Sequence, residues 1–166
     1  MLYNNAAMAY FGWVDQISFE DWCKTINEEI NLVFLLTQAA WPHLQKHGGS
    51  IINTASISAR IGFKLLPAIA HSTAKGAIAS MTRHLAMEGR LHGIRANSIS
   101  PGVIETTQTR PLLKDKTWTE DILGKTMLRR LGQPEEVAWV ALFLATDESS
   151  FVTGADFVVD GGATAW

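Results

Sequence analysis

The sequence has 166 residues, of which 47% are hydrophobic and only 18% are charged, with a formal net charge of −2 at pH 7. This composition excludes a disordered chain, which needs low hydrophobicity and high charge. The sequence lacks the excess of basic residues that is typical of nucleic-acid binding. A single cysteine, Cys23, excludes a disulfide framework. No stretch approaches the roughly 20 apolar residues of a membrane helix, so we expect a cytoplasmic protein with neither a membrane nor a nucleic-acid partner.

The first half of the chain alternates short β-like runs with long helical ones. A strand is predicted at Leu2–Asn5, and Ser18 is the predicted N-cap of a helix that runs to about His47. A short apolar strand with β-branched residues follows at Ser50–Ala55, and a loop is expected over Ser56–Pro67.

The second half continues the same alternation. Its expected elements are a helix over Ala68–His92, a strand at Ile94–Ile99, an irregular segment at Thr107–Leu131 with a short helix around Thr119–Leu123, a helix over Pro134–Ala145 and a strand at Asp156–Val159. Strands that alternate with long helices favour a parallel sheet with helices on both faces. We therefore expect residues 1–166 to form one α/β domain.

Several motifs, in order along the chain, point to a family. They are "NNAA" (Asn4–Ala7), "NLVFLLTQAAWPHL" (Asn31–Leu44), "GSIINTAS" (Gly49–Ser56), "GIRANSISPGVIET" (Gly93–Thr106) and the stretch from Leu131 to Gly162. Together they closely resemble the short-chain dehydrogenase/reductase family. The resemblance implies a Rossmann fold, NAD or NADP as cofactor, and hydride transfer to or from a small alcohol or carbonyl substrate.

The resemblance also implies roles for individual residues. The serine that orients the substrate oxygen is Ser56, with Ser58 as the alternative that the family's spacing allows. The lysine that holds the cofactor ribose is Lys75, and the asparagine that supports a proton-relay water is Asn31, with Asn27 still open. The residues expected to touch the cofactor are Asn5, Lys75, Pro101, Gly102, Ile104 and Thr106.

His71 is the first departure from the family's pattern. It stands where the resemblance places a tyrosine that acts as general acid and base, in "HSTAK" (His71–Lys75). An imidazole beside the Lys75 ammonium should be mostly neutral at pH 7, so it should accept a proton more readily than it donates one. Alcohol oxidation with His71 as base is one reading. The others are that His71 only fills the tyrosine's space, or that it serves a different chemistry in a pocket without cofactor.

The second departure from the family's pattern is that the sequence has no glycine-rich cofactor turn of the form G-x-G-x-x-G. The strands therefore match only the C-terminal part of the family's sheet, its strands 4-5-6-7, in a chain that we expect to be truncated. Leu2–Asn5 then becomes an edge strand, and unpaired edges and bare apolar faces favour association. We expect a homo- or hetero-oligomer through the helices around residues 31–44 and 68–92. A non-catalytic subunit that assembles in this way is the alternative function.

No metal site is predicted. His43 and His47 have the i, i+4 spacing of a metal pair, but no third ligand is evident nearby, and both suit the C-terminal end of a helix dipole.

Overall fold

One parallel sheet of four strands forms the centre of the computed structural model, which describes residues 1–166. The strands β1 (Leu2–Asn4), β2 (Gly49–Thr54), β3 (Ile94–Pro101) and β4 (Asp156–Val159) lie side by side in chain order. Every neighbouring pair is parallel. The predicted α/β, Rossmann-like arrangement is therefore confirmed.

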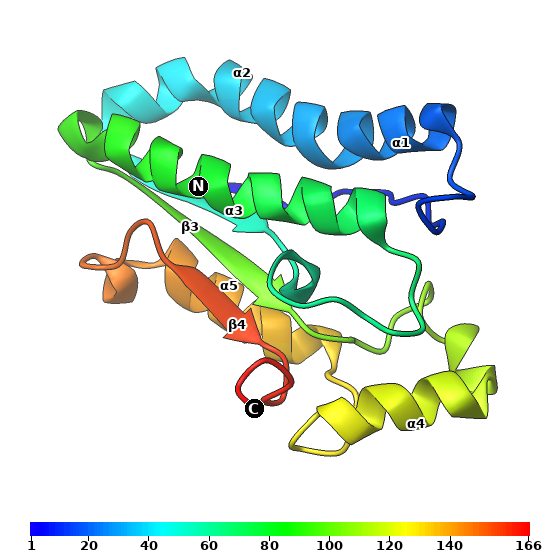
Figure 1. The fold of residues 1–166 in the computed structure, drawn as a ribbon. Coiled ribbons are helices and arrows are strands. Elements are labelled where there is room, and N and C mark those ends of the chain that lie inside the picture. The colour runs from blue at the N-terminus through cyan, green and yellow to red at the C-terminus, as the bar shows by residue number, and fades with distance from the viewer.

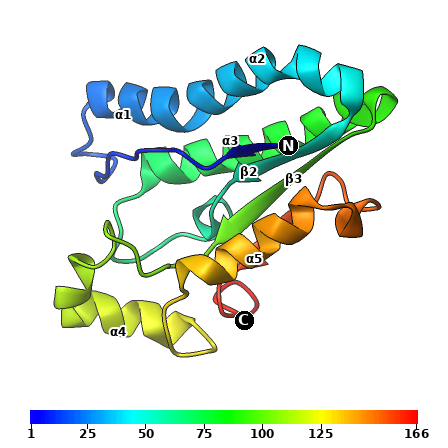
Figure 2. The same ribbon diagram turned by 180° about the vertical axis from the view of Figure 1, so that it is seen from behind.

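Five α-helices connect the strands and cover the sheet: α1 (Phe19–Ile26), α2 (Leu32–His47), α3 (Ile69–Gly89), α4 (Lys116–Lys125) and α5 (Pro134–Ala145). Short 3-10 turns lie at Ile57–Ala59, Arg90–His92, Leu112–Lys114 and Asp147–Ser149. The helices α1, α2 and α3 lie on one side of the sheet and α5 lies on the other, as Figures 1 and 2 show. Helix α4 lies beyond the carboxyl ends of the strands.

The two faces of β2 belong to different cores because successive side chains of a strand point in opposite directions. Ile51 packs with residues of α2, α3 and β3, among them Leu44 and Ala86. Ile52 packs on the opposite face with residues of α5, such as Leu144. A strand that is apolar on both faces is typical of a sheet covered by helices on both sides.

A row of hydrogen-bonded, buried polar side chains connects α2 to α3 by way of β1 and β2. The Asn4 amide donates to Asn53 Oδ1 at 2.8 Å and to Thr37 Oγ1 at 3.1 Å. The Asn53 amide in turn donates to Thr82 Oγ1 at 2.9 Å. All four residues are at most 5% exposed. These hydrogen bonds offset part of the cost of burying their polar groups, although Asn4 Oδ1 has no hydrogen-bond partner.

The predicted helix from Ser18 to His47 is present, and it contains one π-helical turn. Ser18 caps it as predicted, since its hydroxyl accepts from the Asp21 amide at 3.0 Å. A π-helical turn, η1 (Asn27–Asn31), then separates α1 from α2. The helix predicted around Thr119–Leu123 is longer than expected, because the Asp115 carboxylate caps it by accepting from the amides at its start.

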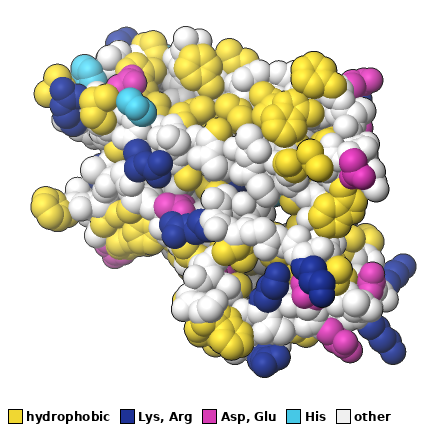
Figure 3. All heavy atoms as spheres, in the orientation of Figure 1, with side chains coloured by type: hydrophobic (Ala, Val, Ile, Leu, Met, Phe, Trp, Pro, Cys, Tyr) yellow, Lys and Arg dark blue, Asp and Glu magenta, His cyan; other side chains and the backbone are white.

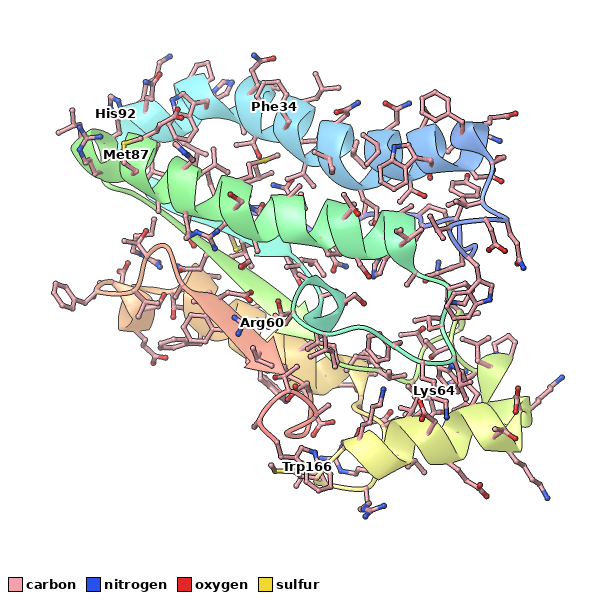
Figure 4. The ribbon with its side chains drawn as sticks, viewed as in Figure 1. Phe34, Arg60, Lys64, Met87, His92 and Trp166 are labelled. Atoms are coloured by element: carbon pink, nitrogen blue, oxygen red, sulfur yellow. The ribbon has the colours of Figure 1, made fainter.

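The outer side of α2 and the end of α3 expose large apolar side chains. Phe34, Leu35, Met87 and Leu91 are between 47% and 78% exposed, and hydrophobic side chains gather over α1 and α2 in Figure 3. Figure 4 shows Phe34 pointing away from the sheet. Association through these helices stays a prediction. None of the helices combines the length and the apolar character needed to cross a membrane.

Candidate active site

A cleft of about 730 Å³ lies at the carboxyl ends of β1, β2 and β3. Its walls come from the segment after β1, the loop between β2 and α3, the start of α3 and the segment from Pro101 to Trp118. The carboxyl ends of parallel strands are where open α/β sheets bind ligands, because the connecting loops diverge there. Figure 1 shows these loops gathered between α1 and α4.

Helix α3 brings His71 and Lys75 to the same wall of the cleft, because residues four apart lie on one face of a helix. Lys75 is buried, and its ammonium donates to the carbonyl of Thr54 at the end of β2, at 3.0 Å. The sequence prediction that these two side chains share one site thus agrees with where the structure places them.

Glu29 joins them from the opposite helix, and sequence reasoning missed it. His71 Nδ1 lies 2.9 Å from Glu29 Oε1 and 3.0 Å from Oε2. Lys75 Nζ lies 3.3 Å from the same Oε1. The side chain of Glu29 is only 2% exposed, and those of Lys75 and His71 are 6% and 17% exposed. A carboxylate buried to this extent needs such partners.

The π-helical turn explains how Glu29 comes to face inward. Thr25, Glu29, Val33 and Thr37 are all buried and follow one another at intervals of four residues. An ideal α-helix has 3.6 residues per turn, so a strict four-residue spacing would drift around its surface. The wider turn at Asn27–Asn31 absorbs this drift. A charged residue at this spacing on a core-facing stripe is the sequence signal that could have identified Glu29.

Asn31 does not lie in the cleft, and neither does its alternative, Asn27. Both are exposed, and the Asn31 amide donates to Asn27 Oδ1 at 2.6 Å on the outer side of the π turn. Asn31 lies two residues beyond Glu29 along the helix, so its side chain points to solvent and not to His71. The structure brings Glu29, not an asparagine, to His71 and Lys75.

Ser56 and Ser58 both line the cleft. The Ser56 hydroxyl accepts from the Ser58 amide and caps the short turn that begins at Ile57. The two hydroxyl oxygens are 3.1 Å apart. The structure therefore keeps both serines as candidates, coupled as a pair rather than as alternatives.

The residues predicted to touch a cofactor also gather at the cleft. Asn5, Pro101, Gly102, Ile104 and Thr106 all line it. Asn5 Oδ1 accepts from the Thr54 hydroxyl at 2.9 Å. The amide NH₂ of Asn5 is left available as a donor at the end of β1.

The segment after β1 forms the part of the cleft wall that contacts His71. The Gly12 amide donates to the Pro67 carbonyl at 2.8 Å, which joins this segment to the loop before α3. The Phe11 ring packs against the His71 ring with 5.7 Å between centroids.

Tyr10, next to Phe11 in the chain, donates a hydrogen bond from its hydroxyl to Glu28 Oε1 at 3.2 Å. Partial burial, followed by the Glu28 carboxylate, raises the pKa of Tyr10 above its ordinary value of 10.0.

The loop between β2 and α3, which forms another part of the cleft wall, contacts α4. Lys125 lies over the Phe63 ring, 5.6 Å from its centroid, and links α4 to the loop between β2 and α3. Figure 4 shows Lys64 of this loop beside α4, while Arg60 points to β4, where it pairs with Asp156 at 2.7 Å. No group of three or more His, Cys, Asp or Glu residues is arranged to hold a metal ion.

A family model described as enoyl-(acyl carrier protein) reductase matches residues 1–164. Relatives include proteins named as members of the short-chain dehydrogenase/reductase (SDR) family. The chain belongs to this family. The sheet, the cleft at its carboxyl edge and the motifs of the chain are therefore those of an SDR protein.

Two curated relatives and one solved structure illustrate the likeness. The 2-dehydro-3-deoxy-D-gluconate 5-dehydrogenase of Bacillus subtilis is 37% identical over 98% of this chain and 63% of its own length. The cyclopentanol dehydrogenase of a Comamonas species is 39% identical over 99% of this chain and 65% of its own length. A gluconate 5-dehydrogenase from Burkholderia cenocepacia, solved with NADP and tartrate, has a TM-score of 0.94 at 30% identity, covering 99% of this chain and 64% of that one.

The chain thus spans a little under two thirds of the length of these relatives. These relatives are named as dehydrogenases, which gives no support to a non-catalytic subunit as the alternative function.

Proposed function

We propose that this SDR chain provides the substrate-binding and proton-transfer residues of an NAD- or NADP-dependent oxidoreductase that interconverts an alcohol and a carbonyl group. The observation that carries the proposal is that one cleft is lined by His71 and Lys75 of α3 and by the hydrogen-bonded hydroxyls of Ser56 and Ser58. Alcohol oxidation requires a proton acceptor and hydrogen-bond donors to the substrate oxygen in one cleft.

The polar end of the cleft fits the nicotinamide and ribose part of such a cofactor. The Asn5 amide and the Thr106 hydroxyl can exchange hydrogen bonds with a carboxamide, and the Lys75 ammonium can donate to a ribose hydroxyl. The solved relative that contains NADP supports this assignment. When bound, the cofactor accepts the hydride in the oxidising direction and supplies it in the reducing direction.

The chain's own residues handle the proton. In the oxidising direction, the His71 imidazole accepts the proton of the substrate hydroxyl. The Ser56 and Ser58 pair donates a hydrogen bond to the substrate oxygen and keeps it directed at His71. In the reducing direction the same imidazole returns the proton to the oxygen.

The walls of the cleft favour an uncharged substrate. Phe11, Phe63, Leu66, Leu112 and Trp118 line it. No arginine lines the cleft, and its single lysine is already paired. Because a carboxylate or phosphate group would find no free cation there, we propose a neutral alcohol or ketone, of the kind named for the cyclopentanol dehydrogenase relative.

Cofactor binding tests the proposal most directly. Millimolar NAD⁺, NADP⁺ or nicotinamide mononucleotide should raise the melting temperature, because a ligand that binds only the folded state stabilises it. Lys75→Met should reduce this shift. His84→Phe should leave it intact, since His84 is an exposed residue on the same helix.

Turnover tests the substrate class. Cyclopentanol with the preferred cofactor should give measurable reduction of that cofactor, and gluconate should give less. His71→Phe should abolish the reaction, whereas His84→Phe should not. The absence of a melting shift with all three nucleotides, together with no turnover, would refute the proposed function.

A further inference from the structure

We propose that Glu29 is a positioning residue that fixes the tautomer of His71, so that Nε2 of His71 is the atom that exchanges a proton with the substrate. The reaction half of this statement rests on the proposed function. The tautomer half concerns the protein alone and can be tested without a cofactor.

The hydrogen-bond geometry specifies which nitrogen carries the proton. Both oxygens of Glu29 lie within 3.0 Å of His71 Nδ1. An ionised carboxylate can only accept hydrogen bonds, so Nδ1 must be the donor. In a neutral imidazole that carries its hydrogen on Nδ1, Nε2 has a free lone pair and can act as a base.

The charges around His71 are balanced when its ring is neutral. The ionisable groups that face it are Glu29 from the π-helical turn and Lys75 from its own helix. The Phe11 ring, which packs on it from the segment after β1, is uncharged. The Glu29 carboxylate and the Lys75 ammonium compensate each other at 3.3 Å.

A proton that arrives at Nε2 would convert His71 to an imidazolium beside a buried carboxylate. Glu29 would stabilise this charge through the hydrogen bond from Nδ1, without itself taking up the proton. The sequence alone suggests a different setting, in which His71 faces only the positive charge of Lys75. Glu29 therefore neutralises the positive charge that Lys75 alone would place beside the proposed base.

Long-range ¹H–¹⁵N correlation spectra of the ¹⁵N-labelled chain report the tautomer of each histidine. They would be recorded at about pH 8.5, two units above the ordinary pKa of an imidazole. The chain has five histidines, and the signal that disappears in His71→Asn identifies His71. We expect its Nδ1 to give a protonated, pyrrole-type signal and its Nε2 an unprotonated, pyridine-type signal.

Removing the acceptor should exchange these two signals. Because Glu29→Leu alone leaves the Lys75 ammonium without its counter-charge, the comparison uses Glu29→Leu combined with Lys75→Met against Lys75→Met alone. Lys75→Met should keep the hydrogen on Nδ1, and the double variant should move it to Nε2, the tautomer that free imidazole side chains prefer. Glu28→Ala is the matched control, since Glu28 lies in the same turn but bonds to Tyr10.

A His71 that carries its hydrogen on Nε2 in the unmodified chain would overturn the proposal. So would a tautomer that is the same in Lys75→Met and in the double variant. Neither result depends on turnover, so a failure of the Glu29 proposal is distinguishable from a failure of the proposed oxidoreductase function.

Discussion

Replacing Lys75 with methionine should destabilise the fold by about 3 kcal/mol. Loss of one partner of a buried ion pair costs about 3–5 kcal/mol, because the remaining charge stays in the protein interior. The ammonium of Lys75 is 3.3 Å from Glu29 and 3.0 Å from the Thr54 carbonyl, and both charged side chains are at least 94% buried. We take the lower value because Glu29 keeps its contact with His71.

Urea unfolding followed by tryptophan fluorescence measures this effect. With a denaturant slope of about 2 kcal/mol/M, the midpoint should fall by about 1.5 M. Lys24→Met is the control, because Lys24 pairs with Glu20 on the exposed side of α1, and its midpoint should stay within experimental error of the unmodified chain.

A double variant decides whether the buried pair is the cause. Glu29→Gln together with Lys75→Met removes both charges, so it should be more stable than Lys75→Met alone. The Thr54 carbonyl still loses its donor, and we therefore expect a residual loss of about 1 kcal/mol. If the two substitutions instead add their separate losses, the reasoning from the buried pair is refuted.

Two further predictions concern the frame around the site. Asn53→Ala should cost about 3 kcal/mol in urea unfolding, because the buried Asn4 amide loses an acceptor at 2.8 Å; a loss below about 1 kcal/mol would contradict this. Hydrogen bonds from Arg130 and the Gln133 amide lower the pKa of Glu136 from 4.5 to about 2. The ionised carboxylate thus stabilises the fold above pH 4.5, and this contribution is lost as the pH falls towards 2. Glu136→Gln should flatten the pH dependence of the urea midpoint in that window, and an unchanged slope would disprove the assignment.

The strands and most helices could be predicted because their signals are local. The apolar run at β2, the cap at Ser18 and the proline at the start of α5 each act through neighbouring residues. The site residues on α3 followed from a motif, and a motif fixes spacing along one helix. The structure accordingly places His71 and Lys75 together.

Glu29 could not be found in the same way because its position depends on a defect in helix periodicity. Asn31 was favoured by its place in the motif, but the π-helical turn directs it outward and Glu29 inward. The partners of Glu29 are more than 40 residues away in sequence. Such a contact depends on the packing of α1 and the π-helical turn against α3. The four-residue spacing could have placed Glu29 on the buried face of its helix, but it could not have identified His71 and Lys75 as the partners.

The polar chain from Thr37 through Asn4 and Asn53 also specifies how β1 docks. This strand has three residues and pairs on one side only. Its length alone therefore does little to favour one alignment with β2 over another. A slip of two residues, the smallest that keeps each side chain on its own face, would set Asn4 opposite Ile51 or Ala55. Both are buried and apolar, and the amide would lose its partner there. The alignment that gives the Asn4 amide nitrogen its two acceptors is therefore also the one that places Asn5 at the mouth of the cleft.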